Sequence, residues 1–218
     1  MSAPPNVRPA RAGEEGVVAS ILTDAFADEA GLNYWLQQGA AKERARARFF
    51  AAAVRDVVHP ERGLWIAEAD GAALGAAIWL GLGLKAYDFS PLQQVAMAPL
   101  LFAVAGVRGS LRGLALGEKL DALHPREPHA HLVFLGVAPS AQGRGVGSAM
   151  LKATLAPLDA AEATAILEAT TERNVALYQR HGFEVTANLH LEDLHVRIMT
   201  RLPQTGFPAG LAASVGAA

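Results

Sequence analysis

The sequence contains no cysteine in its 218 residues. Disulfide bridges, thiolate zinc sites and a cysteine nucleophile are therefore excluded, and a covalent acyl-enzyme would need serine or another nucleophile. An excess of one charge is also missing, since 19 Lys and Arg stand against 21 Asp and Glu, a formal net charge of −2. Without a general basic field, neither nucleic acid nor an anionic membrane is expected as the main partner.

Long hydrophobic runs are absent as well. The longest, Val95–Val107, has about 13 residues and contains Pro99, which makes it too short for a membrane span. The segment Met1–Arg11 has no apolar stretch typical of a secretory signal. We therefore expect a soluble, cytoplasmic protein.

The composition that remains is globular, with 51% hydrophobic and 18% charged residues. The length fits one domain, which we place at residues 1–202, with a helical insertion at 81–128 and a flexible tail at 203–218.

Hydrophobic periodicity predicts a mixed α/β order of elements. The helices expected lie at 14–26, 49–58, within 81–128, at 146–155 and at 174–181. The strands expected lie at 6–10, 64–68, 74–80, 131–137, 165–169, 183–186 and 196–200. Asp70-Gly71 is a hairpin signal between two of these strands. The segment 28–38, with Tyr34 and Trp35, is expected to connect the first two helices.

The strongest motif is the segment Leu135–Gly147, where an apolar strand enters a glycine-rich turn and a helix begins at once. Gly143, Gly145 and Gly147 allow backbone N–H groups to converge on an anion, and the helix N-terminus adds partial positive charge. Arg144 supplies a full charge nearby. This arrangement fits a diphosphate. A Rossmann site would need different spacing near a first strand, and a P-loop would need Gly-Lys-Ser/Thr, so both interpretations fail.

The segment Gln142–Gly147, after its Leu-Gly-Val-x-Pro strand exit, resembles the acetyl-CoA pyrophosphate loop of the GNAT N-acetyltransferase superfamily. A second family segment follows at the expected distance: Leu167–Thr170, Asn174, Leu177-Tyr178 and Gly182–Glu184. The two motifs cover about a quarter of the chain and stand in the family's order. The flanking pieces His124–Pro128 and Met199–Arg201 resemble puromycin N-acetyltransferase and its relatives.

The resemblance implies a mixed, mostly antiparallel sheet whose fourth and fifth strands, 131–137 and 165–169, splay apart around the pantetheine of acetyl-CoA. The cofactor contacts that it implies are Leu135, Gly136, Val137, Gln142, Gly143, Arg144, Gly145, Val146, Gly147, Ser148 and Asn174. Asn174 could instead be a helix N-cap, a position that favours asparagine.

The resemblance also places Tyr178 beside the thioester sulfur, where a phenol can protonate the departing thiolate. A core tyrosine is the alternative. An ammonium acceptor must lose a proton before attack, and Glu127, His129 and His131 at the entry of the fourth strand are the candidates for the base. Relatives have aromatic residues where Ala130 and His131 stand, so details of the pocket do not carry over. A metal site of His124, Glu127, His129 and His131 lacks a confirming motif, and no metal is expected.

Asp28, Tyr34 and Trp35 fall where family members bind the acceptor, although a surface acid and core aromatics would explain them equally. The sequence thus predicts acetyl transfer from acetyl-CoA to a primary amine, expected on a small molecule, in a ternary complex. The alternatives are a non-catalytic CoA-binding module and a protein or peptide N-acetyltransferase. A homodimer is left open.

Overall fold

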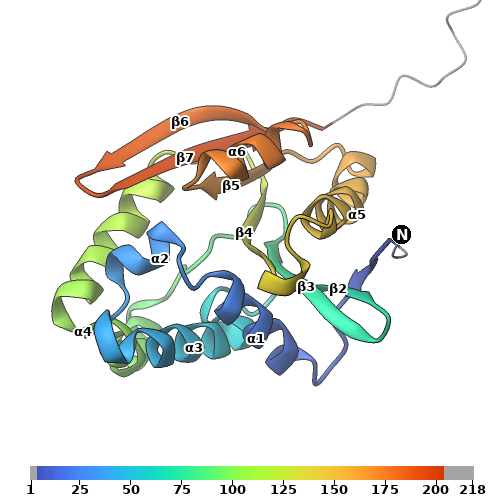
Figure 1. Ribbon diagram of the computed structural model, residues 1–218. Helices are drawn as coiled ribbons and strands as arrows, with labels where there is room; N and C mark the ends of the chain where they lie inside the picture. Colours follow the sequence, from blue (N-terminus) through green and yellow to red (C-terminus); the bar gives the residue numbers. More distant parts are fainter. Residues whose placement is uncertain (1–3, 204–218) are drawn as a thin grey trace, which may run out of the picture.

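Seven strands form one sheet, in the order β1-β2-β3-β4-β5-β7-β6, in the computed structural model (Figure 1). The structure describes residues 4–203, so residues 204–218 of the predicted tail lie outside it. The strands are β1 (Asn6–Pro9), β2 (Gly63–Ala69), β3 (Ala72–Leu80), β4 (Ala130–Val137), β5 (Ala165–Ala169), β6 (Glu184–Leu191) and β7 (Leu194–Arg201). Among the described residues, β4 and β5 are the one pair of strands that runs in parallel, which confirms the mixed, mostly antiparallel sheet.

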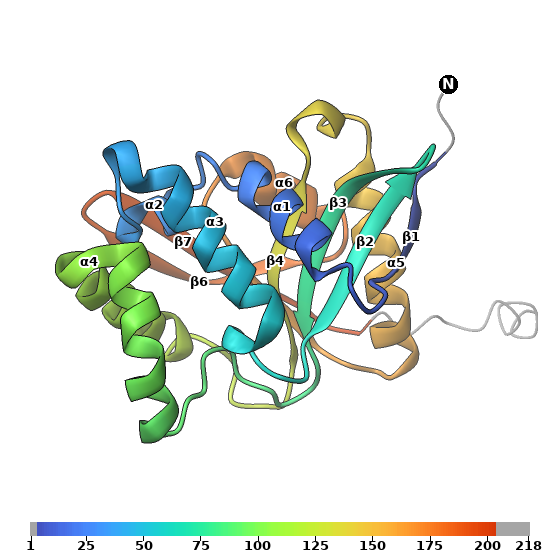
Figure 2. The same cartoon turned by 90° about the horizontal axis from the view of Figure 1, so that it is seen from below.

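Helices cover both faces of the sheet. They are α1 (Glu15–Ala25), α2 (Ala30–Trp35), α3 (Lys42–Ala52), α4 (Pro91–Asp121), α5 (Val146–Ala160) and α6 (Glu172–Gln179), with short turns η1 (Gly39–Ala41), η2 (Ala53–Val57) and η3 (Pro139–Ala141). In Figure 2, α1 and α3 cross in front of the sheet, and α5 and α6 lie behind it. Strand alternation fills both layers, because Ile78 packs toward α1 and α3 whereas Ala77 and Trp79 pack toward α5.

Two of the expected strands and the expected hairpin turn are found at or within one residue of their predicted positions. Strand β5 coincides with the predicted range, and β4 begins one residue early. Asp70 and Gly71 form the tight turn between β2 and β3, with φ of 52° and 75°.

Two expectations about local structure were wrong. The segment 28–38 is not only a loop, because the Glu29 side chain caps a helix, α2, by accepting hydrogen bonds from Gly31 and Leu32 at 2.9 and 2.6 Å. The last two strands are much longer than 183–186 and 196–200, and they form the hairpin β6–β7. Strand β6 lies at the sheet edge and is largely exposed, so its apolar signal is weak.

Helix α4 has 31 residues and bends at Gly106, whose φ of 64° is not helical. The helix is therefore much longer than the apolar run Val95–Val107, whose short length led us to expect no membrane span. By length and composition, it is the one helix in residues 4–203 that could cross a membrane, and 17% of its apolar window is buried. The bend divides it into halves of roughly 15 residues, shorter than the ~20 that a spanning helix needs. Its inner side packs on α2 and α3.

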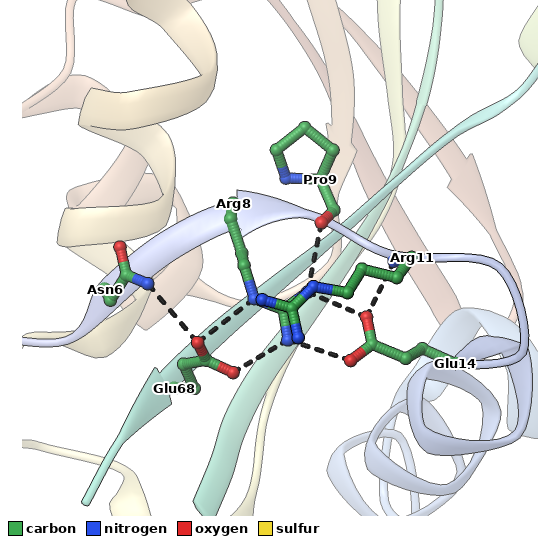
Figure 3. Close-up of polar contacts among 6 residues, drawn as sticks. All are labelled: Asn6, Arg8, Pro9, Arg11, Glu14 and Glu68. Atoms are coloured by element: carbon green, nitrogen blue, oxygen red, sulfur yellow. Dashed lines mark hydrogen bonds and ion pairs between the residues drawn. The ribbon is translucent and has the colours of Figure 1, made fainter. Parts of the chain in front are cut away.

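The first strand is tied down by a polar cluster around Arg8 (Figure 3). The guanidinium donates to both oxygens of Glu14 at 2.7 and 2.8 Å, and to both oxygens of Glu68 at 3.1 and 2.8 Å. Hydrogen bonds from Arg8 and from the backbone N–H of Arg11 lower the pKa of Glu14 to about 2. The cluster joins β1 to β2 and to the start of α1.

Candidate active site

The parallel strands β4 and β5 separate partway along their length. They pair from Ala130–Leu132 to Ala165–Leu167, and the register ends there. One residue later β4 has a bulge at Val133, where its pairing with β3 shifts. Beyond this point the facing edges of β4 and β5 are no longer hydrogen-bonded to each other. Such edges suit an extended ligand that carries amides.

Beyond the gap, β4 runs through the glycine turn into α5. Gly143 and Gly145 have φ of 76° and 82°, a region that favours glycine, with open space beside both. The segment Gln142–Gly145, including Arg144, is exposed, and Val146 is buried as the first residue of α5. The N–H groups that open α5 precede its hydrogen-bonded ladder and favour an anion. The geometry fits a diphosphate, whose binding stays a prediction.

The β4 residues before the turn point alternately to the two layers. Leu135 and Val137 pack toward α5, whereas a Cβ on Gly136 would lie 2.8 Å from Ala25 of α1. A Cβ on Gly147 would meet Val137 at 3.7 Å, an ordinary contact. Gly136 therefore serves the packing of α1, and Gly147 has no steric need to be glycine.

Two further residues predicted to contact the cofactor have partners within the protein. Ser148 Oγ lies 2.7 Å from Nε2 of His181. Thr171 caps α6, because its hydroxyl accepts a hydrogen bond from the Asn174 N–H at 3.2 Å. The interpretation of Asn174 as the N-cap is therefore wrong, and its contact with pantetheine stays a prediction.

Tyr178 lies on α6 and is 7% exposed, with its ring centroid 6.0 Å from that of Phe183. Burial raises the pKa of its phenol, and the charges of Glu168 and Glu29 raise it further. The phenol therefore keeps its proton at neutral pH and gives it only to a strong base. Packing and proton donation are both compatible with this position.

Glu168 of β5 connects two histidines that are distant in sequence. Its Oε1 lies 2.6 Å from Nε2 of His124, and its Oε2 lies 2.9 Å from Nε2 of His131. His131 pairs with Ile166, two residues before Glu168, so both side chains stand on one face of the sheet. Glu168 was not among the predicted site residues. The signal for it was an acidic residue in an otherwise apolar strand.

Glu168 stays ionised although its side chain is only 18% exposed. Burial alone would raise its pKa, but the charge of His131 and the hydrogen bonds from both histidines hold the pKa well below its usual range. A carboxylate this acidic is a poor proton acceptor.

A second carboxylate reaches the end of β5 from the connection between α1 and α2. Glu29 accepts a hydrogen bond from Thr170 Oγ1 at 2.7 Å while it caps α2. These two residues are 141 positions apart in sequence, and sequence analysis did not connect them. The contact fixes the start of α2 beside the gap between β4 and β5.

A cavity of about 580 Å³ lies beside His131, between the end of α4 and the loops 83–86 and 121–129. Its lining includes the three predicted base candidates, Glu127, His129 and His131. Burial lowers the pKa of His129, opposed by a hydrogen bond with the Glu127 carbonyl at 2.8 Å. Of the three candidates, His131 is the one that contacts Glu168. A shallower depression of about 450 Å³ near Glu15 contains no predicted site residue.

The residues predicted to contact the acceptor are not gathered around this cavity. The Asp28 side chain is 99% exposed and lies 3.7 Å from the Lys42 ammonium. Tyr34 and Trp35 lie on α2 and pack against α4 and β7, and the Arg112 guanidinium is 5.3 Å from the centre of the Tyr34 ring. The structure accounts for all three without a ligand, and their contact with an acceptor stays a prediction.

The nitrogen and oxygen atoms of His124, His131 and Glu168 lie within 4.8 Å of one another, close enough to hold a metal ion. This set differs from the four residues considered from the sequence, because Glu127 and His129 do not belong to it. Both carboxylate oxygens are engaged by imidazole nitrogens, so hydrogen bonding accounts for the arrangement.

The sequence matches the acetyltransferase (GNAT) family over residues 22–183, well over half of the chain. The structure is similar to a histone acetyltransferase HPA2 and related acetyltransferase from Corynebacterium glutamicum, with a TM-score of 0.71 and 24% identity over 93% of this chain and 97% of that one. It is also similar to a mosquito arylalkylamine N-acetyltransferase-like 5b (TM-score 0.58, 20% identity, coverage 91% and 99%). The polyamine N-acetyltransferase of Drosophila melanogaster matches with a TM-score of 0.56 and 16% identity, covering 91% and 99%. At these identities the similarity to solved structures concerns the fold.

Proposed function

Because this chain belongs to the GNAT acetyltransferase family, we propose that it transfers the acetyl group of acetyl-CoA to a primary amine by direct attack in a ternary complex. The observation that carries the proposal is the end of β4–β5 pairing a few residues before the exposed glycine turn. The end of strand pairing leaves room for a pantetheine, and the glycine turn suits a diphosphate. The two features follow each other in this order along β4 and its turn. The absence of cysteine leaves direct transfer as the simplest route.

In this proposal the backbone of Leu135, Val137 and Gln142–Gly147 holds acetyl-CoA, which supplies the activated acyl group. His131 takes a proton from the acceptor ammonium, directly or through water. The amine nitrogen then bonds to the thioester carbon, the C–S bond breaks, and Tyr178 donates a proton to the sulfur. Glu127 and His129 remain alternatives for the base, but Glu127 is exposed and burial lowers the pKa of His129.

We further propose that the acceptor is a small molecule. The cavity beside His131, at about 580 Å³, lies in the range of ~300–1,000 Å³ typical of small-molecule sites. The resemblance of His124–Pro128 to puromycin N-acetyltransferase supports this. Because similar folds include both a histone acetyltransferase relative and a polyamine N-acetyltransferase, a protein acceptor is the alternative. We place the reaction in the cytoplasm.

The proposal is tested by thiol release from acetyl-CoA with a panel of small primary amines and of peptides with free N-termini. Turnover with small amines and none with peptides is the expected result. Tight acetyl-CoA binding by calorimetry without release for any amine would identify a CoA-binding module instead.

The base is tested by His131→Gln, with the exposed His190→Gln as the matched control. Loss of the base should lower kcat/KM far more at low pH, where the amine is an ammonium, than at high pH, where it is already neutral. A His131→Gln profile parallel to that of wild type would clear His131 of the role.

A further inference from the structure

We propose that Glu168 is a positioning residue that fixes the tautomer of His131, so that Nδ1 of this histidine is the atom that accepts the acceptor proton. The inference rests on the proposed function for its chemistry, but its structural content can be measured on the protein alone. It assigns a role to a residue on β5 that was not among the predicted site residues.

The direction of the hydrogen bonds to Glu168 fixes the tautomer of both histidines. An ionised carboxylate can only accept, so each imidazole nitrogen that meets it must carry the hydrogen. Both contacts are made by Nε2, at 2.6 Å for His124 and 2.9 Å for His131. A neutral imidazole has one N–H, and Nε2 therefore holds it in both rings. The lone pair of His131 lies on Nδ1.

Glu168 itself is not the base. It follows Leu167, the last β5 residue paired with β4, so it stands at the mouth of the gap. Position alone would favour it over His131. The hydrogen bonds that it accepts from the two imidazole N–H groups stabilise the carboxylate, however, and a stabilised carboxylate does not retain a proton. Glu168 can instead stabilise the imidazolium that forms on His131.

His124 fixes the orientation of the Glu168 carboxylate. Buried carboxylates need partners for both oxygens, and a carboxylate held by one ring could rotate. His124 comes from the loop after α4 and engages the second oxygen, which fixes the carboxylate plane. The rings of His124 and His131 meet edge to face, with centroids 5.1 Å apart. Residues from β5 and from the loop after α4 therefore hold the imidazole of His131, which itself lies on β4.

Other titratable groups surround the cluster on every side. Tyr178 approaches from α6 and Glu29 from the start of α2. Burial, the charge of Glu168 and the charge of Glu29 raise the pKa of the Tyr178 phenol. Tyr87 comes from the loop before α4, where burial and the Glu168 charge raise its pKa although 41% of the residue is exposed. On the cavity side stand His129 and the Lys85–Asp121 pair, 3.4 Å apart. Arg126 and Glu127 also line the cavity.

The proton balance is complete with these residues. The ammonium gives one proton to Nδ1 of His131, which returns it to water in the adjoining cavity. The nitrogen loses its second proton to water in the same cavity as the C–S bond breaks, and Tyr178, which gives its proton to the sulfur, regains one from solvent. One proton is thus released in total for each acetyl group transferred. No oxidant or metal is required.

The decisive experiment is nitrogen NMR of the histidine rings in the wild-type protein, which distinguishes Nε2–H from Nδ1–H. We expect the Nε2–H tautomer in both His124 and His131. Glu168→Gln keeps the shape but loses the charge that stabilises the imidazolium on His131, and it offers one acceptor and one donor, so one of the two rings must also change tautomer. Its kcat/KM should fall by about 10²–10⁴ with the acetyl-CoA Kd unchanged. Glu168→Asp, which keeps the carboxylate, should restore the tautomer and part of the rate.

The matched control is Glu118→Gln, the same change at an exposed acid on α4, which should leave tautomers and rate unchanged. An Nδ1–H tautomer at His131 in the wild type overturns the inference, and this measurement stands even if Glu168→Gln does not fold. Binding of one cobalt(II) ion per chain, lost in Glu168→Gln, also overturns it, since the three residues would then be ligands. The expected tautomers without thiol release for any amine would support the positioning and overturn the proposed function.

Discussion

Tyr178→Phe removes one hydroxyl from a buried ring and keeps the contact of that ring with Phe183. A proton donor to the leaving sulfur acts in the transition state, so acetyl-CoA affinity should barely change while kcat falls by about 10²–10⁴. A thioester with a more acidic leaving thiol should recover most of the loss, because its thiolate needs no proton. Stopped-flow measurement of thiol release compares acetyl-CoA with this second thioester. A variant with the wild-type rate on acetyl-CoA would show that Tyr178 is a packing residue.

Gly145→Val tests the anion site at a residue whose φ of 82° side chains rarely adopt. The branched side chain would enter the open space beside the turn and distort the N–H groups before α5. Calorimetry should show at least a tenfold weaker acetyl-CoA affinity, about 1.4 kcal/mol. Gly39→Val is the control, since Gly39 has a φ of 64° and open space but belongs to η1 and not to the turn. Equal affinities in two folded variants would place the diphosphate elsewhere.

At the scale of elements, α4 approaches α2 closely because two of its residues are glycines. A Cβ on Gly109 would lie 2.1 Å from the Trp35 carbonyl oxygen, and one on Gly113 would lie 3.2 Å from the Trp35 ring. Gly109→Ala must therefore move the helices apart. We expect a loss of stability of about 1–3 kcal/mol in urea unfolding, as for overpacked cores.

The control for this packing is Gly117→Ala in the same helix, where nothing lies within 4 Å of the added Cβ. Alanine is the better helix former there, so stability should rise by a few tenths to about 1 kcal/mol. If both variants were stabilised, α4 would not pack on Trp35 as the structure describes.

At the scale of the whole molecule, the Arg8 cluster joins the N-terminal strand to the rest of the sheet, and its contribution depends on pH. Glu14 has a pKa of about 2 in the folded protein against an ordinary 4.5. A lowered folded-state pKa stabilises the protein above pH 4.5, and this stabilisation is lost as the pH falls toward 2. Arg8→Met should therefore lower Tm at pH 7 and reduce the fall of Tm between pH 5 and 2.5.

The comparison variant is Arg48→Met on α3, an exposed arginine outside the cluster. Its Tm should follow the wild-type dependence on pH. Scanning calorimetry at several pH values gives both curves. An Arg8→Met curve parallel to that of wild type would mean that the cluster does not contribute to acid sensitivity.

Features that depend on neighbouring residues could be predicted from the sequence. Short apolar runs defined β4 and β5, Asp70-Gly71 defined a hairpin, and the spaced glycines defined the turn before α5. These signals are local, because a short apolar run and a positive φ involve only a few adjacent residues. The separation of β4 from β5 followed from the resemblance to the family, and the register confirms it.

The contacts between polar residues at the candidate site could not be predicted from the sequence. Glu168 lies 44 and 37 positions from His124 and His131, and no local pattern sets those contacts. Strand register brings Glu168 and His131 to one face, and the path of the chain after α4 adds His124. The fit of Gly109 against Trp35 likewise depends on how two helices pack. Local propensity is encoded in adjacent residues, whereas side-chain meetings are set by register and packing of the whole chain.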